Sequence, residues 1–312
     1  MKSIAIILIL SLLVACTTHA NNTGHVNETG HSNKAVPANI AGHVDIEPLN
    51  ALSPASITEL TIISNGSRMP GHIYQAAGEG PHPTAIMLHG YPGNEKNLDL
   101  AQALRKAGWN ALFFHYRGAW GSEGEFSFLG AEQDVQTVIA YVENTDNAKR
   151  LKIDPTTVSL VGHSMGGHMA IAGILDSQSV RCAVAHDGAN MGANGKGLFS
   201  DEQSIKLWSN YSDTLFMLNG WSGDKAVAEI SQHGADLDLV MRASNLNGRP
   251  VILIAADTEV IPIDLHIKPL HKALGEHSSK VSYELIDDDH SFSNSRDKLI
   301  SSSLKFLDDN CR

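Results

Sequence analysis

The sequence predicts an α/β fold: a mostly parallel sheet with helices on both faces and a helical cap insertion late in the chain. Short apolar runs alternate with segments of helical spacing from residue 57 onward. Such alternation favours parallel strands joined by helices that cover both faces of the sheet. The interval between Gly188 and Arg249 has helical patterns but no buried strand. Structureless loops of that length are uncommon within a domain, so we expect a cap at about 189–249.

The strands are recognised by short apolar or alternating runs that turn residues separate. The first two, 57–64 and 72–76, flank a turn at Gly66 and should pair with each other. The later runs are almost continuously apolar, which is typical of strands buried on both faces. They are expected at 84–88, 110–116, 158–161, 180–186, 251–256 and 281–286.

The helices are recognised by apolar residues that recur at helical spacing. The segment 98–107 is amphipathic and is followed by Gly108, a typical helix terminator. The other predicted helices of the body are 131–144, 168–175 and 299–307, and those of the cap are 204–215, 225–232 and 236–243. The aromatic residues of the cap, such as Trp208 and Trp221, should line a pocket or pack the cap against the body.

Composition limits the class of partner. The chain has 312 residues, of which 42% are hydrophobic, and a formal net charge of -11. This length suits one large α/β domain or two small ones. Binding to nucleic acid needs clustered Lys and Arg, and the sequence has no basic run, so we expect no nucleic-acid partner. The sequence does not reveal the oligomeric state.

The N-terminus predicts an export signal. Lys2 precedes an apolar stretch, 4–15, that is too short to span a bilayer as a helix. The stretch ends in the letters LVAC and resembles the lipobox of bacterial lipoproteins. This resemblance implies cleavage after residue 15 and a lipid anchor on Cys16, with an outer-membrane location if the cell has two membranes. A plain signal peptide is the alternative.

The next segment, 16–50, is polar, rich in Asn, Thr, Gly and His, and lacks hydrophobic periodicity. We therefore expect a flexible tether there, between a signal at 1–15 and a globular domain at 51–312. The His residues of the tether have no Cys or carboxylate partners at metal-binding spacing, so we expect no metal site. Cys182 and Cys311 remain in the domain, and we expect two separate thiols, with a disulfide as the alternative in an exported protein.

The most informative motif is Gly162-His163-Ser164-Met165-Gly166. It lies between a predicted strand and a predicted helix, which is the context of a nucleophile elbow. The turn is tight, and glycines next to the serine avoid collisions with the adjacent strand and helix. Ser164 is therefore the candidate nucleophile.

A serine nucleophile needs a histidine base that a carboxylate orients. His290 follows the last predicted strand and precedes the last helix, in the chain order that this architecture uses. Asp257 comes directly after strand 251–256 and is the preferred acid. Glu259 and Asp187 are the alternatives.

The developing oxyanion needs two backbone N–H donors. Met165 follows the nucleophile and supplies one of them. The second should come from the loop after strand 84–88, which reads HGYPG from position 89. Tyr91 is the expected donor, because the following residue, Pro92, has no N–H.

Four motifs together resemble the α/β-hydrolase superfamily, and more closely its branch of prolyl-oligopeptidase-type peptidases, dienelactone hydrolases and related esterases. The motifs are HGYPG at 89–93, HYRG at 115–118 with GSEG at 121–124, the elbow at Ser164, and HSF at 290–292. The resemblance covers about residues 57 to 308. It implies that the segment around Arg117 shapes the loop near the oxyanion hole.

These observations predict a serine hydrolase that cleaves a carboxylic ester or a related acyl bond of a small molecule through an acyl-enzyme. No metal and no organic cofactor is expected. A serine exopeptidase of the same fold is one alternative, and a non-catalytic ligand-binding lipoprotein is the other. The sequence does not define the acyl group or the leaving group.

Overall fold

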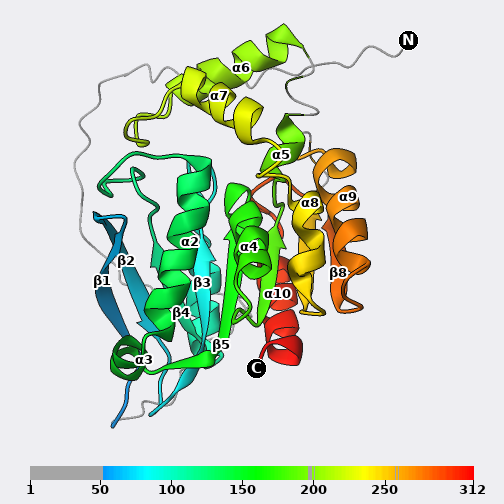
Figure 1. The fold of residues 1–312 in the computed structure, drawn as a ribbon. Helices are drawn as coiled ribbons and strands as arrows, with labels where there is room; N and C mark the ends of the chain where they lie inside the picture. Colours follow the sequence, from blue (N-terminus) through cyan, green and yellow to red (C-terminus); the bar gives the residue numbers. More distant parts are fainter. Residues whose placement is uncertain (1–51, 196–198, 200, 257, 259) are drawn as a thin grey trace, which may run out of the picture. The chain divides into compact units, whose positions relative to one another are not determined.

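A mixed sheet of eight strands forms the centre of the computed structural model, which describes residues 52–195, 199, 201–256, 258 and 260–312 (Figure 1). The strand order is β1-β2-β4-β3-β5-β6-β7-β8. Strands β1 and β2 are antiparallel, as are β2 and β4, and all other pairs are parallel. The bounds are β1 Ser56–Ser64, β2 Ser67–Gln75, β3 His82–Leu88, β4 Asn110–Phe114, β5 Ile153–His163, β6 Cys182–His186, β7 Val251–Ala256 and β8 Val281–Ile286. The predicted strands and their mostly parallel pairing are confirmed.

Helices cover both faces of this sheet. Figure 1 shows α2, α4 and α9 in front of it and α10 behind. The helices of the body are α1 Leu98–Lys106, α2 Phe128–Glu143, α3 Thr145–Leu151, α4 Met165–Asp176, α9 Ile263–Gly275 and α10 Arg296–Asn310. Two apolar cores result, one on each face.

Strand β3 shows how the two cores arise. Its residues Ile86 and Leu88 pack into the core under α2 and α4, whereas Ala85 and Met87 pack into the core under α1 and α10. Successive side chains of a strand point to opposite faces, so one apolar run supplies both cores. The continuous apolar runs of the sequence have this physical origin.

The predicted cap region contains α5 Met191–Asn194, α6 Glu202–Asp213, α7 Gly223–His233, α8 Leu239–Arg242 and the 3-10 helix η2 Ala243–Leu246. Helices α6 and α7 lie above the sheet, beyond the ends of the parallel strands, in Figure 1. Helix α8 instead packs beside α4 and α9. The part of the insertion that stands over the sheet is thus narrower than 189–249.

Two helices of the body, α3 and α9, were not predicted, and neither was the short α5 of the cap region. Helix α9 contains Pro269, and a proline inside a helix removes one backbone hydrogen bond and weakens the helical pattern. Helix α3 is a short segment, and Asn144 begins it by accepting hydrogen bonds from two backbone N–H groups. Local capping rather than periodicity sets this element.

Cys182 and Cys311 form a disulfide, with their Cα atoms 5.8 Å apart. The expectation of two separate thiols is therefore wrong. Cys182 opens β6 and Cys311 follows α10, so the bond joins the last helix to the middle of the sheet. A sequence separation of 129 residues hid this proximity from sequence reasoning.

The predicted signal peptide, the tether and Cys16 lie outside the described residues. Among the helices that the structure does describe, none is long and apolar enough to cross a membrane.

Arg117 has the structural role that the resemblance implies. Its Nε donates to Asp134 Oδ1 at 2.5 Å, and Nη2 donates to the carbonyl of Gly130 at 2.9 Å, which fixes the loop after β4 to α2.

Candidate active site

Ser164 lies on a strained turn between β5 and α4. Its φ of 59° and ψ of -120° lie in a region of backbone conformation that residues other than glycine rarely adopt. Ser164 N–H donates to the carbonyl of His186 at 2.9 Å, and the Ser164 carbonyl accepts from Ala189 N–H at 3.1 Å. A Cβ at Gly162 would collide with the main chain of Gly166, so the close approach of strand and helix requires glycine. This is the geometry of a nucleophile elbow.

His290 is bonded to Asp187. Its Nδ1 lies 2.5 Å from Asp187 Oδ2, and the other carboxylate oxygen accepts from Ala256 N–H at 3.1 Å. The Asp187 side chain is fully buried, whereas that of His290 is 22% exposed. Because a carboxylate only accepts, Nδ1 carries the proton and Nε2 can accept one from a substrate or a hydroxyl.

The bond to Asp187 gives this residue the place of the orienting acid, for which the sequence analysis preferred Asp257. Asp257 and its rival Glu259 lie outside the described residues. Asp187 follows β6, and its contact with the last residue of β7 brings its carboxylate to the place expected of a residue after β7. Within the described residues, Asp187, one of the two alternatives, is the carboxylate bonded to His290, and the preference for Asp257 stays a prediction.

The candidate nucleophile and the candidate base lie in adjoining segments. His163 Nε2 donates to the carbonyl of His290 at 2.7 Å, and the two imidazole ring centres are 4.6 Å apart. Burial is the main cause that lowers the pKa of His163 to about 3, so its ring stays neutral. Among the hydrogen bonds of the described residues, none joins Ser164 Oγ to His290. Such bonds are often long in unliganded enzymes and shorten when substrate binds.

The loop that carries His290 is held on its other side by Arg296. Its guanidinium donates to the carbonyl of Ser291 at 2.9 Å and to Asn97 Oδ1 at 2.8 Å. It also pairs with Asp99 at the start of α1. The loop of the candidate base is therefore held between the elbow and α1.

The segment after β3 passes next to the nucleophile. A Cβ built at Gly90 would lie 3.5 Å from Ser164 Oγ, so the main chain leading to Tyr91 borders the serine hydroxyl. Met165 is the first residue of α4, and the first N–H groups of a helix lack an intrahelical acceptor. Both predicted oxyanion donors thus belong to segments that border Ser164.

Aromatic side chains of the cap pack on Tyr91. The Tyr91 ring stacks on Trp208 with ring centres 5.5 Å apart, and its hydroxyl accepts from Trp221 Nε1 at 2.7 Å. Burial raises the pKa of Tyr91 to about 12, so the hydroxyl stays protonated near neutral pH. Phe216, another aromatic residue of the cap region, is 91% exposed and neither lines a pocket nor packs the cap against the body.

Two cavities adjoin α7, and neither is lined by Ser164 or His290. One of about 440 Å³ lies between α7 and the start of α2, and the other, of about 700 Å³, lies between α5 and α7. The charged groups of the first cavity are already paired, as Arg117 with Asp134 and Lys225 with Glu125. We therefore locate the candidate site from the Ser164 and His290 contacts and not from these cavities.

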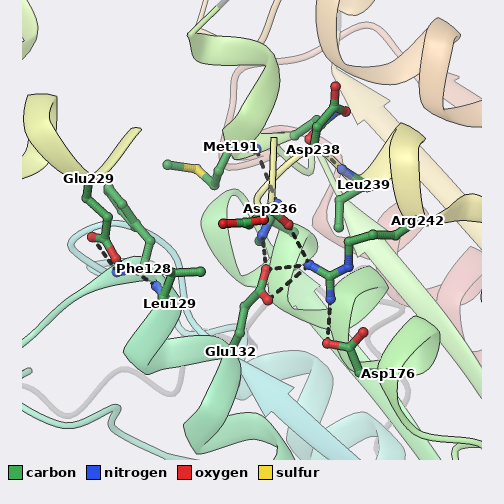
Figure 2. Close-up of polar contacts among 12 residues, drawn as sticks. Phe128, Leu129, Glu132, Asp176, Met191, Glu229, Asp236, Asp238, Leu239 and Arg242 are labelled. Atoms are coloured by element: carbon green, nitrogen blue, oxygen red, sulfur yellow. Dashed lines mark hydrogen bonds and ion pairs between the residues drawn. The ribbon is translucent and has the colours of Figure 1, made fainter. Parts of the chain in front are cut away.

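A charged network fixes α4 one turn after the nucleophile (Figure 2). His168 Nε2 donates to Glu132 Oε1 at 2.8 Å, and its Nδ1 accepts from Met191 N–H at 3.2 Å. Arg242 of α8 donates to both Glu132 oxygens at 3.0 Å and pairs with Asp176. Burial opposes ionisation of Glu132, but the bonds to His168 and Arg242 outweigh it and lower its pKa.

The remaining ionisable residues do not converge. Within the described residues, His, Cys, Asp and Glu side chains form no group of three or more that could hold a metal ion.

Sequence reasoning missed the contact of His163 with the His290 loop and gave Asp187 as an alternative acid. The available signal for Asp187 was its position directly after a buried strand, which Asp257 shares.

Comparison with known proteins places this geometry in a family context. The model of the BD-FAE family matches residues 72–193. An uncharacterized 31.7 kDa protein in the traX-finO intergenic region of Escherichia coli is 30% identical over 140 residues, which cover 44% of this chain. The same match covers 47% of that protein, so the chain spans about half the length of this relative.

Solved structures of known enzymes share the fold. The esterase Pf2001 of Pyrococcus furiosus superposes with a TM-score of 0.59 at 16% identity, covering 83% of this chain and 94% of its own. The acylaminoacyl peptidase of Pyrococcus horikoshii gives a TM-score of 0.64 at 16% identity, covering 84% of this chain and 42% of its own.

The strand order, the strained turn and these neighbours define the class of protein: the chain is an α/β-hydrolase by fold. The predicted resemblance to this superfamily is confirmed. The neighbours named above, an esterase and an acylaminoacyl peptidase, have this same fold.

Proposed function

We propose that the protein is a serine hydrolase that cleaves a carboxylic ester or a related acyl bond through an acyl-enzyme. The supporting observation is the 2.5 Å bond between His290 Nδ1 and Asp187, next to a serine on a strained turn. A histidine oriented in this way removes the proton of a serine hydroxyl and later returns it to the leaving group.

The reaction would proceed in two acyl transfers. Ser164 Oγ attacks the substrate carbonyl carbon while His290 Nε2 takes the hydroxyl proton. The N–H groups of Tyr91 and Met165 bind the oxyanion, and the protonated His290 delivers its proton to the departing alcohol. Water, deprotonated by His290, then attacks the acyl-enzyme and releases the acid and the free serine. Asp187 stabilises the imidazolium in both steps.

The test is hydrolysis of a panel of short acyl esters together with labelling by a fluorophosphonate. We expect the wild-type protein to release alcohol and to be labelled once, and Ser164→Ala to do neither. A folded wild-type protein that resists the label and cleaves none of the panel would point to the non-catalytic ligand-binding lipoprotein instead.

The acylaminoacyl peptidase neighbour favours a second candidate, a serine exopeptidase of the same fold. Its reaction uses the same residues but releases an amine. Assaying aminoacyl-anilides beside acyl esters, with Ser164→Ala in both arms, separates the two. A kcat/KM for anilides that exceeds the value for esters would favour the peptidase.

We further propose that the protein is exported and lipid-anchored through Cys16. The apolar N-terminus and the LVAC letters support this, and so does the Cys182–Cys311 disulfide, because such bonds persist in oxidising compartments. In cells fed a radiolabelled fatty acid, the wild-type chain should take up label and partition with membranes. Cys16→Ser should do neither, and equal uptake by both chains would refute the anchor.

A further inference from the structure

Helix α6 is the least embedded helix of the cap. Ser212 is the single buried residue among its twelve, and Tyr211 is 42% exposed. Its far end is joined to the next cap segment, where Gly223 N–H donates to Asp213 Oδ1 at 2.7 Å. An element with so little buried surface opens at low free-energy cost.

Helix α7 and the segment before it are tied to the body by hydrogen bonds. Glu229 of α7 accepts from the N–H groups of Phe128 and Leu129, at 2.9 and 3.0 Å, at the start of α2 (Figure 2). The segment before α7 is also paired with the body, since Phe126 N–H donates to the Asn219 carbonyl at 3.0 Å. Helix α7 is thus fixed in a way that α6 is not.

Among the described residues, Tyr91 is the one outside the cap that forms a hydrogen bond with α6. Its hydroxyl donates to Ser212 Oγ at 2.8 Å. The directions follow from chemistry. The Trp221 indole only donates, so it donates to Tyr91, and the Ser212 hydroxyl donates to the Trp208 carbonyl at 2.9 Å. The Tyr91 hydroxyl proton therefore points to Ser212. The three hydrogen bonds form one chain, from Trp221 through Tyr91 and Ser212 to the Trp208 carbonyl.

The same residue reaches the nucleophile through its main chain. The segment from Gly90 to Tyr91 borders Ser164, and the Tyr91 N–H is the proposed oxyanion donor. One residue thus carries a donor for the reacting oxygen on its backbone and the contact with α6 on its side chain. A shift of α6 acts on the oxyanion segment through the Tyr91 ring.

We propose that Tyr91 is a positioning residue that holds α6 closed over the site and couples the position of α6 to the oxyanion hole. The proposal rests on the proposed serine hydrolase function. It makes α6 a gate that discriminates by acyl size: a small acyl group is accommodated with the Tyr91–Ser212 bond intact, whereas a bulky one must displace α6 and break that bond.

Two variants each remove one partner of the Tyr91–Ser212 bond, and a third variant is their matched control. Tyr91→Phe keeps the ring but deletes the donor, and Ser212→Ala deletes the acceptor. Tyr211→Phe makes the same chemical change on the exposed tyrosine of α6. Each is measured by the kcat/KM ratio of a bulky acyl ester to an acetyl ester, and by hydrogen exchange of residues 202–213.

We expect Tyr91→Phe and Ser212→Ala to raise the bulky-to-acetyl ratio by about two- to tenfold, the range that one hydrogen bond accounts for. Tyr91→Phe should also lower kcat for the acetyl ester with little change in KM, because the oxyanion donor loses its support. Exchange in α6 should rise by a similar factor in both variants and stay unchanged in Tyr211→Phe.

Unchanged exchange and an unchanged acyl ratio in both variants would overturn the proposal. If Tyr91→Phe fails to fold, Ser212→Ala decides by itself, since it leaves the bond from Trp221 to Tyr91 in place. The exchange measurement is independent of turnover. Failure of the hydrolase proposal, seen as no effect of Ser164→Ala, is therefore distinguishable from failure of the coupling.

Discussion

At the scale of single residues, the assignment of the acid is the sharpest claim. Asp187→Asn keeps an oxygen for the Ala256 N–H but no longer stabilises the imidazolium of His290. We expect kcat on a short acyl ester to fall by about 10³–10⁴, as is usual when the acid of such a triad is neutralised. Circular dichroism should show a native fold.

Asp257→Asn is the matched control for this experiment, because it makes the same change after the neighbouring strand. It should retain activity within a few-fold of wild type. A large loss in Asp257→Asn with an active Asp187→Asn would return the role to the residue that the sequence analysis preferred.

Sequence reasoning located some of these residues and not others for a physical reason. The contexts of Ser164 and Met165 are local, since a strand, a tight turn and a helix are contiguous in the chain. The contact of His163 with the carbonyl of His290 joins residues 127 positions apart. The choice between Asp187 and Asp257 likewise depends on which strand end faces the histidine loop, which only the three-dimensional register decides.

At the scale of elements, the elbow depends on the close approach of β5 and α4. In Gly162→Ala the new Cβ would collide with the main chain of Gly166, which cannot move without shifting the helix. We expect the thermal midpoint to fall by about 5 °C or more and ester hydrolysis to fall with it, as overpacking typically costs about 1–3 kcal/mol.

Gly275→Ala is the control for that substitution. Gly275 ends α9, and a Cβ there meets no atom within 4 Å. Alanine restricts the unfolded chain, so stability should be unchanged or slightly higher. Differential scanning calorimetry measures both variants, and equal midpoints for the two would contradict the steric account of the elbow.

Helices were predicted correctly where burial of one face makes apolar residues recur at helical spacing. The helix predicted at 98–107 is observed as α1 Leu98–Lys106, because one apolar stripe faces the sheet. Helix α9 was missed although four of its residues are buried, since Pro269 interrupts its pattern. Within the predicted cap, α8 has helical spacing but packs beside α4 and α9 of the body.

At the scale of the whole molecule, buried neutral histidines predict sensitivity to acid. Burial is the main cause that lowers the pKa of His89, His163 and His186 to about 3 and that of His266 to about 4. The unfolded chain binds these protons near pH 6.5 and the folded chain does not. Stability is therefore greatest above pH 6.5 and falls as the pH drops toward the folded values.

Urea unfolding at pH 7.0 and pH 5.5 measures this effect. Each of the four histidines should lower the free energy of unfolding by roughly 1 kcal/mol over that interval. His186→Gln should reduce the pH dependence by its share, whatever its stability at pH 7.0. Equal stability of the wild-type protein at both pH values would show that these rings titrate normally in the folded state.

The Cys182–Cys311 disulfide is expected to contribute to stability but not to ester hydrolysis. Cys182 opens β6, and Asp187 follows the other end of the same strand, so the disulfide and the proposed acid lie at opposite ends of five residues, or about 16 Å. We therefore expect Cys182→Ala/Cys311→Ala to keep kcat on a short acyl ester at 25 °C while losing about 2–5 kcal/mol of unfolding free energy.

Reductant provides the matching measurement. Dithiothreitol should lower the thermal midpoint of the wild-type protein and leave that of the double variant unchanged, since only the wild type has a bond to break. The large loop that the bond closes, with a sequence separation of 129 residues, makes its restriction of the unfolded chain strong. A wild-type midpoint that is insensitive to reductant under denaturing heat, or a double variant that loses activity at 25 °C, would contradict this separation of roles.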